Sequence, residues 1–128
     1  GACYGFYFCE LAEYYTREAN DELPMLKLLY QSLRALLNKH IPDELVRYIF
    51  ELKTLVINGD CPVEFDEFEI SESARYALSF VTASPPEKLY TFTVSETVLG
   101  ELRFVLRRFR DLYMEGKFKS LEILEEMS

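Results

Sequence analysis

One stretch constrains the fold more than any other, and it reads LVRYIFELKTLVI at residues 45–57. Its apolar residues recur at the spacing of one helix face, and more of them widen that face around one flank. The first set is Leu45, Tyr48, Ile49, Leu52, Leu55 and Val56, and the second is Val46, Phe50 and Ile57. A helix so nearly encircled by apolar side chains is typical of the middle of a bundle.

The ends of this central helix and its polar side also follow from the sequence. Pro42 is a favoured first helical residue, and Asn58-Gly59 is a typical C-terminal signal. A narrow stripe remains for contact with water, and it consists of Asp43, Arg47, Glu51, Thr54 and Asn58.

Further helices are expected before and after the central one. Their ranges are residues 2–17, residues 20 to about 37, 71 to about 84, 95 to about 115, and a short helix from Ser120. The inward face of the second helix is predicted to consist of Met25, Leu26, Leu29, Leu33, Leu36 and Leu37. Residues 88–94 have strand-like propensity but no clear partner, so we interpret them as a connector. The chain is therefore predicted to be all-α, a single-domain bundle of about six helices spanning residues 1–128.

Composition narrows the class of protein further. The 128 residues carry a formal net charge of −8, which argues against a domain that binds nucleic acid by a net basic surface. The three cysteines are far apart and odd in number, so we expect reduced thiols in a cytosolic protein. No apolar run is long enough to span a membrane. The first helix runs from Gly1 straight into aromatic residues without a cap, so we expect that a preceding domain is missing.

Motifs for catalysis or metal binding are absent from the sequence. His40 lies in a polar turn without neighbours at the spacing of a catalytic triad. Cys61 precedes an acidic loop at residues 60–70, but it has no cysteine or histidine partner near it in sequence. The acidic residues of the loop do not match a calcium-binding pattern. We therefore expect no catalytic residue, no cofactor and no metal.

Arginines concentrate near the C-terminus. Arg103, Arg107, Arg108 and Arg110 fall in one window, and the spacing of Arg103, Arg107 and Arg110 predicts a shared helix face. This face is interpreted either as a docking patch for a phosphate backbone or acidic peptide, or as a solubilising face paired with glutamates.

Three stretches together resemble one known family. They are ACYGFYFCELAEYYT at 2–16, LVRYIFELKTLVINGDCP at 45–62 and FKSLEIL at 118–124. The second stretch is similar to the family's pattern at Arg47, Phe50, Glu51, Leu52, Leu55, Gly59 and Pro62. The family is the C-terminal helical domain of RecO, the bacterial mediator of DNA repair and recombination.

The resemblance implies a function that residue chemistry alone does not reach. RecO acts with RecR and RecF, and its N-terminal oligonucleotide-binding domain, which supplies much of the DNA contact, would be the missing domain. The helical domain would contact RecR and the acidic tail of single-strand-binding protein. Arg47 is the first choice for the tail and Arg34 a weaker one. Residues 60–70 would replace the zinc ribbon that many members carry. The protein would be cytoplasmic and associated with the nucleoid.

Two other hypotheses remain open. The first is a helical domain that binds single-stranded DNA directly through the arginines of residues 103–110. The second is an unrelated small enzyme or metal protein.

Overall fold

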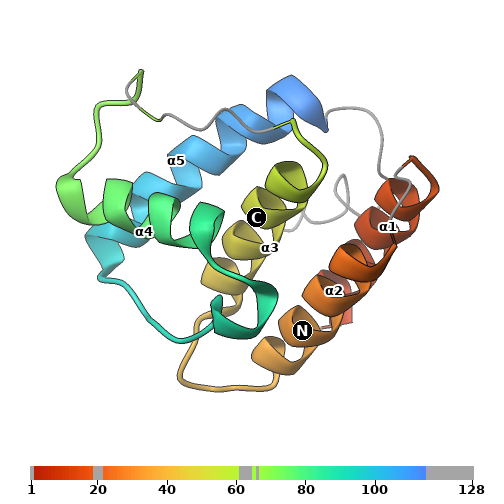
Figure 1. Cartoon of the computed structure of the whole chain (residues 1–128). Coiled ribbons are helices and arrows are strands. Elements are labelled where there is room, and N and C mark those ends of the chain that lie inside the picture. Colours follow the sequence, from red (N-terminus) through yellow and green to blue (C-terminus); the bar gives the residue numbers. More distant parts are fainter. Residues whose placement is uncertain (1, 19–21, 61–64, 66, 115–128) are drawn as a thin grey trace.

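The computed structural model describes residues 2–18, 22–60, 65 and 67–114, and in this part the chain is all-helical (Figure 1). The elements are α1 (Ala2–Glu18), α2 (Leu23–Leu36), α3 (Asp43–Ile57), α4 (Glu72–Ala83), the short 3-10 helix η1 (Pro86–Lys88) and α5 (Glu96–Tyr113). The described residues contain no strand, so the predicted fold class is confirmed. The short helix expected from Ser120 lies outside the described residues.

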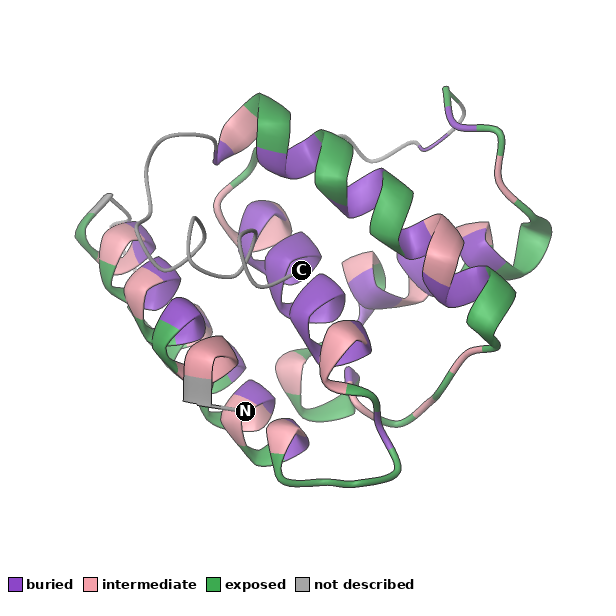
Figure 2. Cartoon of the chain, turned by 180° about the vertical axis from the view of Figure 1, so that it is seen from behind, coloured by how far each residue is buried: buried purple, intermediate pink, exposed green. Residues whose placement is uncertain are grey.

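Helix α3 lies in the middle of the bundle (Figure 1). It contacts α1 and α2, which pack together on one side, and α4 and α5, which pack together on the other. The helix is buried along almost its whole length, as its purple colour in Figure 2 shows. The prediction of a central helix is therefore confirmed.

The two ends of α3 are formed in different ways. Pro42 occupies the N-cap position, one residue before the first helical residue, with an extended backbone. At the other end Gly59 adopts a positive φ of 76°, which glycine reaches without strain. The amide of Asp60 donates to the Leu55 carbonyl at 2.9 Å and that of Gly59 to the Val56 carbonyl at 3.1 Å. This pair of bonds is the Schellman motif, and it ends the helix where the sequence predicts.

Aromatic side chains of α1 pack into the core beside α3. Tyr7, Phe8, Leu11 and Tyr15 are buried. The ring of Phe8 stacks on that of Phe50 with centroids 4.2 Å apart. Stacked aromatic pairs of this kind stabilise a core beyond the area that they bury.

The predicted inward face of α2 is partly wrong. The buried residues are Met25, Leu28, Ser32 and Ala35, whereas Leu26 is 51% and Leu37 is 83% exposed. The remaining predicted leucines, Leu29, Leu33 and Leu36, are half-buried beside this face. The helix turns a serine inward because the Ser32 hydroxyl pairs with the Tyr90 hydroxyl at 2.5 Å. A pattern of apolar residues alone does not indicate such a polar contact between distant segments.

Helices α4 and α5 begin where their serines predict. The hydroxyls of Ser71 and Ser95 accept hydrogen bonds from the amides of Ala74 and Val98, each at 3.2 Å. Between the two helices, residues 89–94 form a connector without strand pairing, as expected. Leu89 is fully buried in it.

The described part of the acidic loop is anchored by apolar side chains. Phe65 and Phe68 are 3% and 7% exposed, and their rings lie 6.2 and 5.7 Å from that of Phe109. The Arg75 guanidinium donates to the carbonyls of Phe65 and Phe68 at 3.1 and 3.4 Å. Glu67 and Glu69 remain exposed. The loop is therefore part of the packed domain at these positions.

Candidate functional site: an arginine network around helix α3

The polar stripe of α3 does not face water. Arg47 is 5% exposed, and Glu51 and Thr54 are fully buried. The expectation of a solvated stripe is wrong for these residues, because α1 and α5 cover this side of α3. Spacing alone does not distinguish a solvated stripe from a buried polar one.

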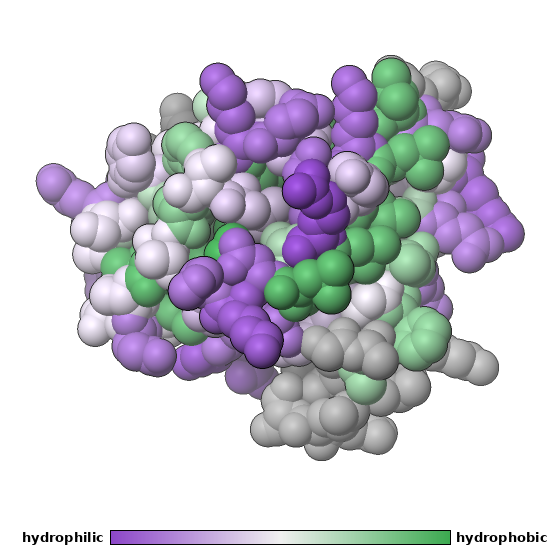
Figure 3. All heavy atoms as spheres, turned by 90° about the horizontal axis from the view of Figure 1, so that it is seen from below, coloured by the Kyte–Doolittle hydropathy of each residue, from purple (hydrophilic) through white to green (hydrophobic). Residues whose placement is uncertain are grey.

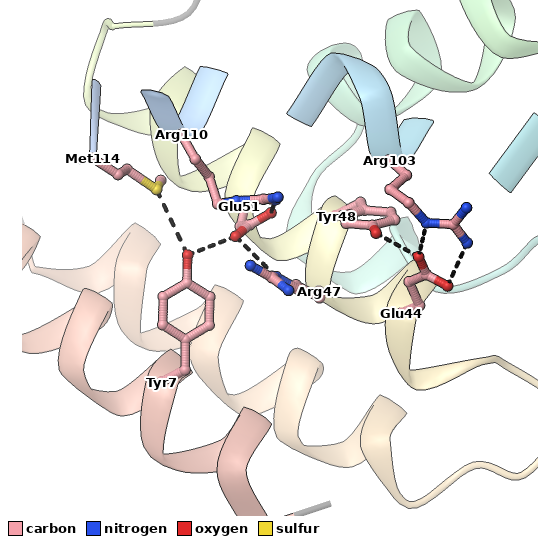
Figure 4. A network of polar contacts seen from close by, with 8 residues as sticks. All are labelled: Tyr7, Glu44, Arg47, Tyr48, Glu51, Arg103, Arg110 and Met114. Atoms are coloured by element: carbon pink, nitrogen blue, oxygen red, sulfur yellow. Dashed lines mark hydrogen bonds and ion pairs between the residues drawn. The ribbon is translucent and has the colours of Figure 1, made fainter. Parts of the chain in front are cut away.

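Glu51 is the centre of a buried network (Figure 4). Its carboxylate accepts hydrogen bonds from the Tyr7 hydroxyl at 2.6 Å, from Arg47 Nε at 3.2 Å and from Arg110 Nη1 at 2.8 Å. The Arg47 guanidinium also lies 5.6 Å from the centroid of the Tyr7 ring. One carboxylate thus faces two guanidinium groups and a hydroxyl, contributed by α1, α3 and α5. We call Tyr7, Arg47, Glu51 and Arg110 the inner network.

The hydroxyl of Tyr7 is held in its protonated form. Burial raises the pKa of Tyr7 well above its usual value, and the neighbouring Glu51 carboxylate raises it further. A neutral hydroxyl can donate to the carboxylate, whereas a phenolate would repel it. The same hydroxyl lies 3.7 Å from the sulfur of Met114, directly after α5.

A second cluster lies about two helical turns away along α3, at the edge of the bundle. Glu44 accepts from the Tyr48 hydroxyl at 2.5 Å, from Arg103 Nη2 at 2.9 Å and also from Arg103 Nε. The hydrogen bonds from Arg103 lower the pKa of Glu44, and burial together with Glu44 raises that of Tyr48. The side chains of Glu44 and Arg103 are 30% and 53% exposed. We call Glu44, Tyr48 and Arg103 the outer cluster.

The two sites fix the direction in which α5 crosses α3. Glu44 pairs with Arg103 and Glu51 with Arg110, and both pairs are separated by 59 residues. Equal separation means that the two helices run in the same direction, as Figure 1 also shows.

The remaining predicted site residues lie apart from this network. Arg34 is exposed on α2, with its guanidinium 5.6 Å from the centroid of the Tyr30 ring. Arg107 and Arg108 are exposed on α5. On the predicted shared face, Arg103 and Arg107 are therefore exposed and Arg110 is buried.

Several relevant residues were not among the predicted site residues. Tyr7 and Glu51 bind the buried arginines, Lys53 is buried, and Phe104 is 63% exposed between the arginines of α5. The available signal for Glu51 was its position four residues after Arg47 on a helix with almost no polar surface.

Within the described residues, no three His, Cys, Asp or Glu side chains gather as a metal site would need. Cys3 and Cys9 are not joined in a disulfide, and Cys61 lies outside the described part. His40 is exposed, and its backbone amide donates to Asn38 Oδ1 at 2.9 Å. Among the described helices, none is long and apolar enough to cross a membrane.

Apolar side chains also reach the surface among charged ones, as the face in Figure 3 shows. The large exposed ones are Phe6, Leu23, Leu26, Tyr30, Leu37, Tyr76, Phe104 and Leu112. Exposed aromatic and aliphatic residues beside arginines are the composition that protein interfaces favour.

The fold and the inner network together define an all-α domain whose buried charges join its helices. Residues 2–67, just over half of the chain, match the family model described as "Recombination protein O C terminal". The chain belongs to this family, which acts in DNA repair and recombination. The match covers α1, α2 and α3 and ends in the loop before α4. No curated protein and no solved structure matches the chain.

Proposed function

We propose that this domain is a non-enzymatic protein-interaction module of a recombination mediator in the RecFOR pathway. It would contact RecR and the acidic, phenylalanine-ended tail of single-strand-binding protein, in the cytoplasm beside the nucleoid. Membership in the recombination protein O family is the observation that carries this proposal. Exposed arginines and apolar side chains add the chemistry that such a tail requires.

The exposure of the arginines ranks them as contacts for the tail. Arg34 lies at the surface beside Tyr30, which is 60% exposed, so a cation and an aromatic ring are offered together. Arg47 reaches a partner only if its pairing with Glu51 opens. We therefore place Arg34 first for direct contact and assign Arg47 to positioning α3.

Fluorescence anisotropy with a labelled peptide ending Asp-Asp-Asp-Ile-Pro-Phe tests the tail contact. We expect saturable binding that Arg34→Ala weakens about tenfold, which is the effect of losing one charge-assisted hydrogen bond of roughly 1.4 kcal/mol. Arg107→Ala is the matched control, because it removes an equally exposed arginine from α5. Absence of saturable binding to the unmodified domain would remove the tail from the proposal. Co-elution with RecR in gel filtration tests the other partner separately.

A second candidate function is direct binding of single-stranded DNA by α5. Phe104 is 63% exposed and lies in the same helix as the exposed Arg107 and Arg108, so a base could stack on its ring while the arginines meet phosphates. Arg103 and Arg110 contribute less positive charge to this surface, because they pair with Glu44 and Glu51.

The salt dependence of oligonucleotide binding tests this second function. With two available arginines, the slope of log K against log salt should be only about −1.4. Arg107→Ala and Arg108→Ala should each reduce the slope, and Arg34→Ala should leave it unchanged. If a labelled oligonucleotide is not retained at low salt, direct binding by this domain is wrong.

A further inference from the structure

The segment 91–95, directly before α5, has the side-chain pattern of a strand but no strand partner among the described residues (Figure 1). Its side chains alternate between exposed and half-buried, in the order Thr91, Phe92, Thr93, Val94 and Ser95. Alternation with a period of two is the pattern of a strand with one buried face. Threonine, phenylalanine and valine are also residue types that strands favour. Ser95 itself has an extended backbone, with φ of −70° and ψ of 163°.

The backbone of this segment has hydrogen-bonding groups without partners. In the described part of the chain, the amides and carbonyls of Phe92, Thr93 and Val94 form no hydrogen bond. After them, the Ser95 carbonyl accepts from the Leu99 amide at 2.9 Å, which begins α5. Unpaired amides and carbonyls along an extended segment are a template for pairing with another strand.

An open groove of about 830 Å³ lies between this segment and α4. Helix α4 contributes Tyr76 and Phe80 to its lining, and the segment contributes Phe92. The rings of Phe80 and Phe92 meet edge-on with centroids 5.3 Å apart. Tyr76 is 73% exposed, so most of its surface is open to a ligand. The groove therefore offers aromatic contacts directly beside the unpaired backbone.

The charge around the groove is negative. Residues 67–101 contain six glutamates, one arginine and one lysine. Glu72 lines the groove in the first turn of α4, is exposed, and forms no ion pair with another described residue. The Glu101 carboxylate lies beside it, because it accepts from the amide and hydroxyl of Ser71 at 2.6 and 2.8 Å. Charge complementarity therefore requires a basic ligand.

We infer that the segment 91–95 is an edge strand that pairs with an extended, basic segment of a partner protein. The partner's backbone pairs with the free amides and carbonyls, its apolar side chains enter the groove, and its basic side chains meet Glu72 and the ring of Tyr76. A second copy of this segment would bring two acidic grooves together, and a small molecule would leave the backbone groups unpaired. The inference goes beyond the proposed function, because it concerns α4 and the start of α5 and requires a partner whose charge is opposite to that of an acidic tail.

NMR titration of the ¹⁵N-labelled domain with the peptide acetyl-Thr-Lys-Val-Arg-Val-Lys-amide tests the pairing. Both ends are blocked, so no free terminus contributes to binding. We expect saturable binding with a Kd of roughly 0.1–1 mM, as for a short peptide that is ordered on binding. Exchange with water should slow at alternate amides, because successive amides of a strand point to opposite edges. The slowed amides should be those of Phe92 and Val94 if one edge pairs, and those of Thr91 and Thr93 if the other does.

Modified peptides separate backbone pairing from general charge attraction. One version carries N-methyl groups on its valines, and a second carries them on its basic residues. Only one edge of the peptide can pair, so one version should lose binding and the other should keep it. A third version with glutamate in place of every lysine and arginine should not bind.

Variants at exposed positions of the domain test the groove without disturbing the core. Tyr76→Ala should weaken binding several-fold, and Tyr30→Ala, which removes a tyrosine 60% exposed on α2, should leave it unchanged. Glu72→Gln should weaken binding about threefold, as the loss of an exposed ion pair does. Glu87→Gln removes an exposed glutamate outside the groove and should have no effect.

Three results would overturn the inference. The first is the absence of slowed exchange at alternate amides when the peptide is added. The second is equal binding of the glutamate version. The third is self-association of the domain, measured by sedimentation, that slows the same amides without peptide, since a second copy would then be the occupant.

Discussion

Helices α3 and α5 are joined by the inner network and by the outer cluster. Both contain glutamate, arginine and tyrosine, but they differ in burial. The inner site pairs Glu51 with Arg110, whose side chains are 0% and 6% exposed. The outer site pairs Glu44 with Arg103, at 30% and 53% exposed. A tyrosine hydroxyl donates to each carboxylate. A similar arrangement of side chains therefore occurs once in the buried core and once where it is partly exposed to solvent.

The difference in burial changes how the inner network and the outer cluster each contribute to stability. An exposed ion pair competes with water and salt, and its measured contribution is small. A buried pair loses hydration, so its net contribution to stability is also limited, but removal of one partner leaves charges without compensation. The inner network also joins α1, α3 and α5, which fixes how they meet. We infer that its main effect is on the arrangement of the helices.

The largest expected effect is that of Glu51→Gln. The change keeps the shape of the side chain and removes the buried negative charge that Arg47 and Arg110 both contact, so the free energy of unfolding should fall by about 3–5 kcal/mol. Urea denaturation at neutral pH measures this loss. Glu44→Gln is the matched control and should lose about 0.2–1 kcal/mol. Equal losses in the two variants would contradict the distinction between the sites.

The next effect is a recovery of stability. When Glu51→Leu is combined with Arg47→Met and Arg110→Met, the inner network no longer contains a buried charge that needs compensation. We expect the triple variant to be more stable than Glu51→Gln, and within about 1–4 kcal/mol of the unmodified domain in either direction. Denaturation gives the stability, and the spread of amide NMR signals reports whether one helix arrangement persists. A triple variant as unstable as Glu51→Gln would indicate that the network acts through packing shape.

The hydroxyl of Tyr7 should contribute about 1.5–3 kcal/mol, as hydrogen bonds to charged groups do. Its folded pKa is raised above 10.0, so this contribution is complete below pH 10 and falls as the pH rises through the folded value. Tyr7→Phe should therefore be less stable at neutral pH and should lose less stability than the unmodified domain above pH 10. Denaturation from pH 7 to 11 measures both effects, with Tyr48→Phe as the control at the outer site. A Tyr7→Phe domain with unchanged alkaline sensitivity would assign that sensitivity to other groups.

The comparison also shows what the sequence could predict. The apolar spacing of α3, the serine caps and the Asn58-Gly59 end are local signals, and the structure follows them. Burial of Arg47 and Arg110 depends on Glu51 and Tyr7, which other segments or other turns bring close. Ser32 is inward for the same reason, because its partner Tyr90 is 58 residues away. Contacts between distant segments thus decided which polar residues are accessible, and spacing did not encode them.

The smallest effect belongs to the outer cluster, and it is the one most sensitive to solution conditions. The pKa of Glu44 is lowered below 4.5 by the hydrogen bonds from Arg103, so its stabilisation is present above pH 4.5 and is lost as the pH falls through the folded value. The difference between the unmodified domain and Glu44→Gln should be about 0.2–1 kcal/mol at pH 7 and should shrink at pH 3. It should also shrink in 1 M salt, where the screening length is about 3 Å. A difference that persists in 1 M salt would mean that Glu44 and Arg103 behave as a desolvated pair, and exposure would then not explain how the two sites differ.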